Sequence, residues 1–199
     1  MTMQMSYRFS LEILTKSGET TITMVILMLC LKADLENVSS IALRHDQNLC
    51  LTVKNPLSDY EAREKVVMNP SETVEQEEGS RLPDHHFSLT WEGVKKPSTL
   101  TILDEAGAKA ALKKKKGSKL PGEYTANDSG NWASLLAVEC RGLEPTAFFP
   151  MGNEFVVTSS GGKEFNEDVD FSEGDWADYD DENDLPVSIS NIQFKWESA

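Results

Sequence analysis

Short apolar runs, each closed by a turn signal, recur along this chain and constrain its fold more than any other feature. Alternating or continuous apolar runs indicate strands at residues 25–31, 48–54, 87–91, 99–103, 132–139, 154–158 and 187–196. Gly, Pro and Asn residues separate these runs, and no long stretch has the periodicity of an amphipathic helix. The sequence therefore predicts an all-β or β-dominated fold with little helix.

Two segments do not fit this strand pattern. Residues 1–23 are mostly polar, and we expect a disordered N-terminal extension there. Residues 106–123 are rich in Ala and Lys and end in Gly and Pro, which favours a surface insertion with a helical turn and a basic loop. Its lysines could serve as a nuclear signal, but a solvated loop that balances an acidic body explains them more simply.

The charge balance excludes several classes of partner. The chain has 33 acidic and 19 basic residues and a net charge of -14. We therefore expect no nucleic acid and no membrane surface as partner, because both attract positively charged proteins. The most apolar run, residues 24–31, is far shorter than the roughly 20 residues that cross a bilayer. Three widely spaced cysteines favour a reducing compartment, the cytoplasm or also the nucleus.

An acidic segment, residues 164–186, contains eleven Asp and Glu residues and no Lys or Arg. It lacks the central Gly of an EF-hand loop, so calcium binding is not favoured. We expect Phe171, Trp176 and Tyr179 to fix this segment to the protein body while its acids stay in water. Aromatic and acidic side chains together predict a surface for a protein partner. Its residues are Trp176, Tyr179, Asp178, Asp180 and Asp181.

Catalytic motifs are missing from the sequence. There is no GxSxG, P-loop or HExxH pattern, and the three histidines are His45, His85 and His86. A pair formed by Cys140 and one of these histidines is the remaining candidate for covalent chemistry. We expect instead that the chain is not an enzyme and that Cys140 packs at the end of a strand.

Several motifs, taken in order, identify a family. ECRGLEP (residues 139–145) resembles the signature of the eukaryotic CXXC-motif-containing zinc-binding proteins. LKADLENV (31–38), GSR (79–81), YTANDSG (124–130), VDFSEGDWADYD (169–180) and PVSISNI (186–192) are similar to further family motifs in the same order. The resemblance covers the chain from about residue 24 to its end.

This resemblance implies two similar small β lobes, and we place them at residues 24–105 and 124–199. It also implies one tetrahedral zinc in the N-terminal lobe, held by four thiolates from two CxxC pairs that follow two strands. In this chain the four expected cysteine positions are occupied by Asn55, Ser58, Trp91 and Val94. Neither an Asn–Ser nor a Trp–Val pair is a zinc-binding pair. We therefore expect no cofactor and an apolar plug of Trp91 and Val94 in the vacated space.

The functional prediction is a monomeric protein-interaction module that has lost its structural zinc and binds an unidentified protein. The alternative is a zinc protein with replacement ligands, namely Cys50, His85 and His86, with Asp59 nearby. The signature residues are expected to be structural, with an ion pair between Arg141 and Glu144 across the turn. These residues are Glu139, Cys140, Arg141, Gly142, Glu144 and Pro145.

Overall fold

The computed structural model describes residues 24–76, 82–113 and 119–199. The expectations for residues 1–23, for the GSR loop and for Lys114, Lys115 and Lys116 lie outside the described residues. Strands dominate the described chain, as predicted. They are β1 (Met24–Glu36), β2 (Val38–Leu43), β3 (Leu49–Lys54), β4 (Ala62–Met68), β5 (Phe87–Leu89), β6 (Ser98–Leu103), β7 (Tyr124–Thr125), β8 (Ala133–Arg141), β9 (Glu144–Phe149), β10 (Phe155–Ser159), β11 (Glu164–Phe165), β12 (Trp176–Asp180) and β13 (Leu185–Ser198).

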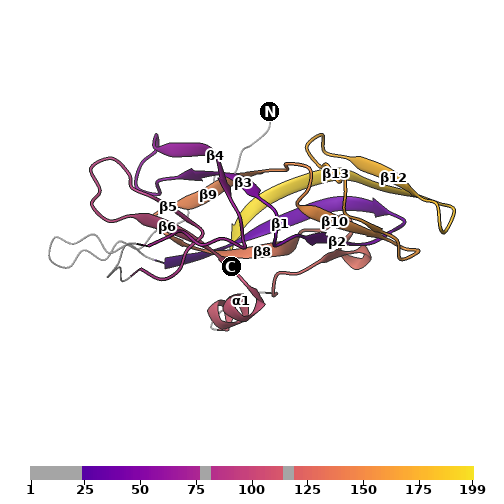
Figure 1. Cartoon of the computed structure of the whole chain (residues 1–199), viewed down its shortest axis with the longest axis horizontal. Helices are drawn as coiled ribbons and strands as arrows, with labels where there is room; N and C mark the ends of the chain where they lie inside the picture. Colours follow the sequence, from indigo (N-terminus) through magenta and orange to yellow (C-terminus); the bar gives the residue numbers. More distant parts are fainter. Residues whose placement is uncertain (1–23, 77–81, 114–118) are drawn as a thin grey trace, which may run out of the picture.

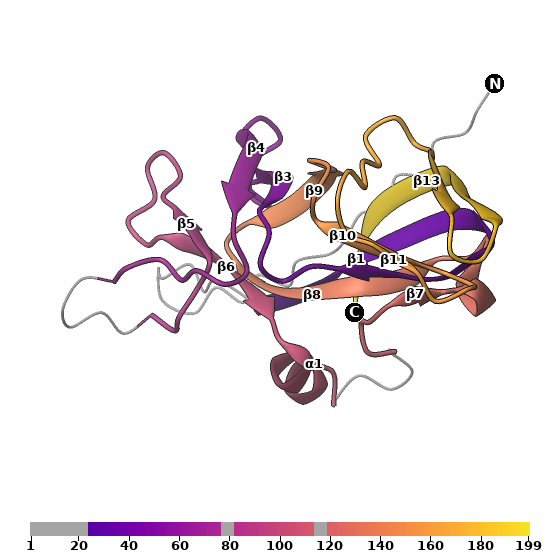
Figure 2. The same ribbon diagram turned by 45° about the vertical axis from the view of Figure 1, so that its right-hand side comes forward.

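These strands form three antiparallel sheets. The six-stranded sheet has the order β12-β13-β1-β8-β6-β5, the four-stranded sheet β11-β10-β2-β7, and the three-stranded sheet β4-β3-β9. The long strands β1, β8 and β13 run through the middle of the molecule (Figure 1). The sheet of β3, β4 and β9 lies at one end with β5 and β6, whereas β2, β10 and β12 lie at the other end (Figures 1 and 2).

The apolar run at residues 25–31 is a strand with both faces covered. Side chains alternate across a strand, and here they enter two cores. Leu27, Leu29 and Leu31 enter the main core, while Ile26, Met28 and Cys30 face a second, smaller core. Burial on both faces explains why this strand lacks the apolar–polar alternation of a half-exposed strand.

The second core is covered by the helix α1 (Glu105–Leu112), whose Ala108 and Leu112 are buried there. Asp104 caps the helix, since its carboxylate accepts a hydrogen bond of 2.7 Å from the amide of Gly107. The predicted surface insertion therefore begins with a short helix that packs against β1 and β8 (Figure 1). Lys113 and Lys119, on either side of residues 114–118, are exposed.

The two ranges predicted as lobes both contribute strands to every sheet. Residues 24–105 supply β1, β5 and β6 to the six-stranded sheet, β2 to the four-stranded sheet, and β3 and β4 to the three-stranded sheet. Residues 124–199 supply the remaining strands of all three sheets. Because β1 pairs with both β8 and β13, the two ranges share their longest strand contacts. The two ends of the molecule are therefore each built from both ranges.

Candidate functional site

Two turns contain the positions at which the family pattern has cysteines. The first turn, residues 55–61, connects β3 to β4. The amide of Asn55 donates to the carbonyl of Glu61 (2.8 Å), which closes the turn. The Asn55 side-chain oxygen accepts from the Leu57 amide (3.0 Å), and the Ser58 hydroxyl oxygen accepts from the amides of Tyr60 and Glu61 (both 3.3 Å). Both residues at cysteine positions of the family pattern therefore hydrogen-bond to the backbone of their own turn.

The second turn, residues 91–94, follows β5. The Val94 amide donates to the Trp91 carbonyl (3.1 Å), and Gly93 adopts a positive φ of 73° that favours glycine. Trp91 is 2% exposed, and the guanidinium of Arg63 lies 5.5 Å from the centre of its ring. Val94, in contrast, is 38% exposed. The expected apolar plug is therefore formed by Trp91 without Val94, which lies at the solvent-facing end of the turn.

One carboxylate joins the two turns. One oxygen of Glu61 accepts a hydrogen bond of 2.6 Å from the Asn55 side-chain amide, and the other accepts from the backbone amide of Glu92 (3.3 Å). Glu61 thus contacts a residue of each turn. We call Asn55, Glu61 and the Glu92 amide the turn clasp. Sequence reasoning missed this role, although Glu61 follows Ser58 at the spacing of a Ser-x-x-Glu cap.

The proposed replacement ligands do not converge. Cys50 lies on β3 between Phe149 and Val67, and burial raises the pKa of its thiol. The Nδ1 atom of His85 donates to the Pro83 carbonyl (2.9 Å), whereas Nδ1 of His86 accepts from the Ile102 amide (3.0 Å). Within residues 24–76, 82–113 and 119–199, no three His, Cys, Asp or Glu side chains are placed to hold a metal ion.

The signature residues 139–145 form the end of β8, a tight turn and the start of β9. Cys140 is 1% exposed, and burial together with the nearby Glu144 and Glu139 raises the pKa of its thiol far above the ordinary value. The thiol is therefore protonated at neutral pH, which disfavours nucleophilic chemistry. The expected ion pair between Arg141 and Glu144 is wrong. Arg141 pairs with Glu139 (2.7 Å), and Glu144 pairs with Lys54 (3.5 Å) because β9 lies beside β3.

The signature turn also positions Trp91. Gly142 has a φ of 71°, and its carbonyl accepts hydrogen bonds from the Trp91 indole nitrogen and the Ser98 hydroxyl, both 2.8 Å. The next residue, Leu143, is 2% exposed and belongs to the main core. The family signature of this chain is thus in direct contact with the residue at one of the four cysteine positions. Sequence reasoning treated these two features separately.

The acidic segment contains β11, β12 and the start of β13. Ten of its eleven acids are exposed: Glu164, Glu167, Asp168, Asp170, Glu173, Asp175, Asp178, Asp181, Glu182 and Asp184. Asp180 is the exception at 0% exposure, so its predicted solvation and its place in the partner surface are wrong. It accepts hydrogen bonds from the Ser159 hydroxyl (2.6 Å) and the Asn183 side chain (2.9 Å), which keep the pKa of its carboxyl below the ordinary value.

The aromatic residues of this segment differ in their exposure. Phe171 is 2% exposed and stacks on Phe155 with a centroid distance of 4.6 Å. Trp176 is half-buried and packs edge-on against Phe165, whereas Tyr179 is 47% exposed and hydrogen-bonds to Asp184. The exposed part of the predicted partner surface therefore consists of Tyr179, Asp178, Asp181 and one side of Trp176.

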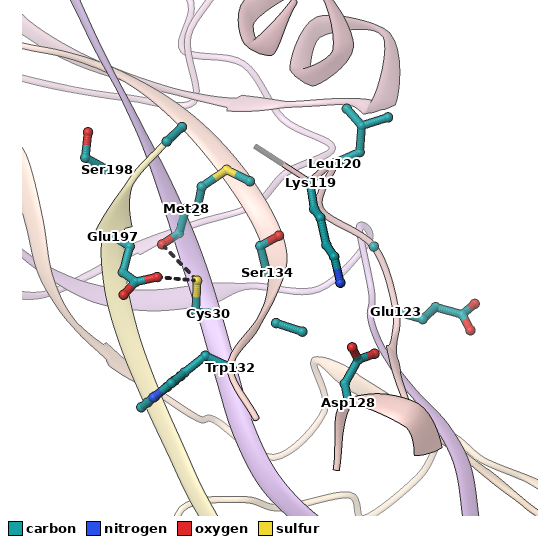
Figure 3. A pocket seen from close by; sticks show the side chains of 13 residues that line it. Met28, Cys30, Lys119, Leu120, Glu123, Asp128, Trp132, Ser134, Glu197 and Ser198 are labelled. Atoms are coloured by element: carbon teal, nitrogen blue, oxygen red, sulfur yellow. Dashed lines mark hydrogen bonds between the residues drawn. The ribbon is translucent and has the colours of Figure 1, made fainter. Parts of the chain in front are cut away.

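A cavity of about 320 Å³ opens beside the second core, lined by residues from β1, β8, β13 and the segment before β7 (Figure 3). The Cys30 thiol points toward the Glu197 carboxylate at 3.7 Å, and burial and this carboxylate raise its pKa to about 11. Lys119, Glu123 and Asp128 line the opposite wall (Figure 3). No histidine lines this cavity, and its only thiol is protonated at neutral pH, so it shows no activated nucleophile.

The fold and the two turns together define an all-β protein whose family signature lies against a pair of facing turns at one end. Residues 28–197 match the family described as "CXXC motif containing zinc binding protein, eukaryotic", and the chain belongs to this family. The family assignment made from the ordered motifs is thereby confirmed.

Relatives and solved structures agree with this membership. A Drosophila melanogaster protein named "UPF0587 protein CG4646" is 29% identical over 174 residues, covering 87% of this chain and 97% of that protein. The human "CXXC motif containing zinc binding protein" is 35% identical over 69 residues, or 35% of this chain and 42% of that protein. A "Hypothetical protein from plasmodium falciparum" has the same fold, with a TM-score of 0.71, 24% identity, and coverage of 86% of this chain and 99% of that one.

A helix long and apolar enough to cross a membrane does not occur among the described residues.

Proposed function

We propose that this chain is a non-enzymatic, monomeric protein-binding module that folds without zinc and acts in the cytoplasm or nucleus. The turn clasp carries the zinc-free part of this proposal. A structural zinc site holds two turns together through four bonds to the metal. Here Glu61 connects the same two turns through hydrogen bonds to Asn55 and to the Glu92 amide. Buried Trp91 fills space beside them.

The acidic end of the molecule supports a basic protein as the partner. Ten exposed acids lie on residues 164–184, and Lys163 is the only cation between residues 160 and 186. Lys163 is already paired with Asp181 at 2.5 Å. A field of one sign attracts an oppositely charged partner and raises its rate of association. The exposed ring of Tyr179 adds an aromatic contact of the kind that contributes strongly to protein interfaces.

The opposite end has a different character. Around the two turns, exposed basic residues (Lys54, Arg63, Lys65, Lys95 and Lys96) alternate with exposed acidic residues (Asp59, Glu64 and Glu92). Five basic and three acidic residues leave the surface around the turns without an excess of negative charge. A basic partner is therefore expected to meet the acidic end.

Two double variants, each with a pair of charge-reversing substitutions, test the binding site. Asp178→Lys with Asp181→Lys changes the acidic end, and Asp59→Lys with Glu92→Lys changes the net charge equally at the turns. Binding of a decalysine peptide is measured by fluorescence anisotropy at low and high salt. We expect salt-sensitive binding that the first pair weakens strongly and the second pair changes little. Equal weakening by both pairs would assign the binding to net charge alone.

A further inference from the structure

Two serines in this chain have an acidic residue at the first and at the third following position. They are Ser58, in the sequence Ser-Asp-Tyr-Glu, and Ser172, in the sequence Ser-Glu-Gly-Asp. Protein kinases with a basic substrate groove recognise acidic residues at these positions. The sequence alone does not distinguish the two serines, but their surroundings in the structure do.

We propose that Ser172 is a phosphorylation site for an acid-directed protein kinase and that its phosphate strengthens the binding of a basic partner to the acidic end. The second half of this inference rests on the proposed function. In the reaction, the Ser172 hydroxyl oxygen attacks the γ-phosphorus of ATP. The bond from this phosphorus to the bridging oxygen breaks, ADP leaves, and the hydroxyl proton passes to the base of the kinase.

Ser172 is accessible and its hydroxyl is free. The residue is exposed and lies between β11 and β12, where residues 166–175 form no strand or helix. Its backbone amide donates to the Asp170 carboxylate (2.8 Å), but its hydroxyl makes no hydrogen bond within the described part of the chain. The two acids that follow it, Glu173 and Asp175, are exposed as well. A kinase can therefore reach the hydroxyl and the acids that mark it.

Ser58 has the same acidic spacing but a different environment. It is half-buried, and its hydroxyl oxygen accepts hydrogen bonds from the amides of Tyr60 and Glu61. Glu61, which would mark the site, is engaged in the turn clasp with Asn55 and the Glu92 amide. Phosphorylation of Ser58 would require the turn to open, so this serine is a matched negative control.

The neighbouring charges determine what a phosphate at position 172 does. A phosphoserine adds about -1.5 to -2 charges at neutral pH. Phosphates order a protein segment when Arg or Lys side chains lie close enough to bind them. Lys163 is the only cation between residues 160 and 186, and it already pairs with Asp181. Arg44 of the β2–β3 connection also reaches this segment, where it donates to the Asn166 carbonyl (3.2 Å), but its guanidinium is already paired with Asp46 (3.0 Å). The phosphate therefore adds to the negative field of the acidic end, which strengthens attraction to a basic partner.

Purified protein is incubated with casein kinase 2, an acid-directed kinase, and magnesium ATP, and modified residues are located by mass spectrometry. We expect one phosphate per chain at Ser172, loss of this phosphate in Ser172→Ala, and normal incorporation in Ser58→Ala. Absence of phosphate at Ser172, while a standard acidic peptide is modified in the same reaction, would overturn the proposal. Preferential modification of Ser58 would also overturn it.

Binding of the decalysine peptide is then compared between phosphorylated and unmodified protein. Tighter, salt-sensitive binding of the phosphorylated form is expected, and unchanged or weaker binding would overturn the regulatory half of the inference. The location of the phosphate is measured without any partner. A failure of the proposed function, seen as no peptide binding by the unmodified protein, is therefore distinguishable from a failure at Ser172.

Discussion

Trp91 is a large buried side chain at the end with the two turns. It is 2% exposed, and its indole nitrogen donates to the Gly142 carbonyl at 2.8 Å. Truncation to Ala removes a large buried side chain, so we expect Trp91→Ala to lower the free energy of unfolding by about 3–5 kcal/mol. Trp91→Phe retains an aromatic ring and should lose less. Urea unfolding measures both, and equal stability of Trp91→Ala and the wild type would show that the ring contributes no packing.

Asp180 makes the stability depend on pH. Hydrogen bonds from Ser159 and Asn183 lower the pKa of its carboxyl in the folded state. A lowered folded pKa contributes stability above the unfolded pKa of about 3.9, and this contribution disappears as pH falls through the folded pKa. Asp180→Asn should therefore be less stable than the wild type at neutral pH, and this difference in stability should disappear at low pH. The unfolding midpoints of the variant and the wild type should differ at about pH 7 and converge at about pH 3. The same difference at both pH values would contradict this expectation.

The two turns form the next larger unit, and the turn clasp is what connects them. Removing the carboxylate in Glu61→Ala leaves the Asn55 side-chain amide and the Glu92 amide without this acceptor. We expect a loss of about 1–3 kcal/mol in unfolding free energy and faster hydrogen exchange at the Glu92 amide.

Glu92→Ala is the matched control for this experiment. It removes an exposed carboxylate one residue after Trp91 but keeps the backbone amide that donates to Glu61. Its stability and exchange should resemble those of the wild type. If both variants exchange equally fast, the contact between Glu61 and the Glu92 amide does not hold the turns together.

At the scale of elements, the local sequence pattern was sufficient to predict those strands that contain a strong apolar run. The runs at residues 48–54 and 187–196 correspond to β3 and β13. β4 has no counterpart among the predicted strands, because its first four residues, Ala-Arg-Glu-Lys, carry no apolar pattern and are exposed. β12 lies in the acidic segment and is a strand through its pairing with β13. Such strands depend on a partner far along the chain, which local pattern does not reveal.

The candidate site was predictable to a similar extent. The motif order located Asn55, Ser58, Trp91 and Val94, but the burial of Trp91 and the exposure of Val94 depend on contacts with Gly142 and with solvent. The role of Glu61 was missed because a Ser-x-x-Glu spacing usually marks a helix start, whereas β4 follows here. Asp180 was expected in water together with the other acids of its segment, but it is buried and accepts a hydrogen bond from Ser159.

At the scale of the whole molecule, all three sheets contain strands from both ranges predicted as lobes. The molecule also separates its charge, with ten exposed acids at residues 164–184 and mixed charges around the turns. The charge separation fits the proposed binding of a basic partner at the acidic end. At the other end, we propose that hydrogen bonds and packing at the two turns replace zinc.

The metal content of protein purified from zinc-supplemented cells tests this claim most directly. We predict zinc well below one equivalent per chain after gel filtration, and a thermal unfolding curve that a strong chelator does not shift. A ligand that binds only the folded state raises the unfolding temperature, so a bound structural zinc would be visible in this curve. One zinc per chain that survives gel filtration, with unfolding on chelation, would contradict the account and point to Cys50, His85 or His86 as ligands.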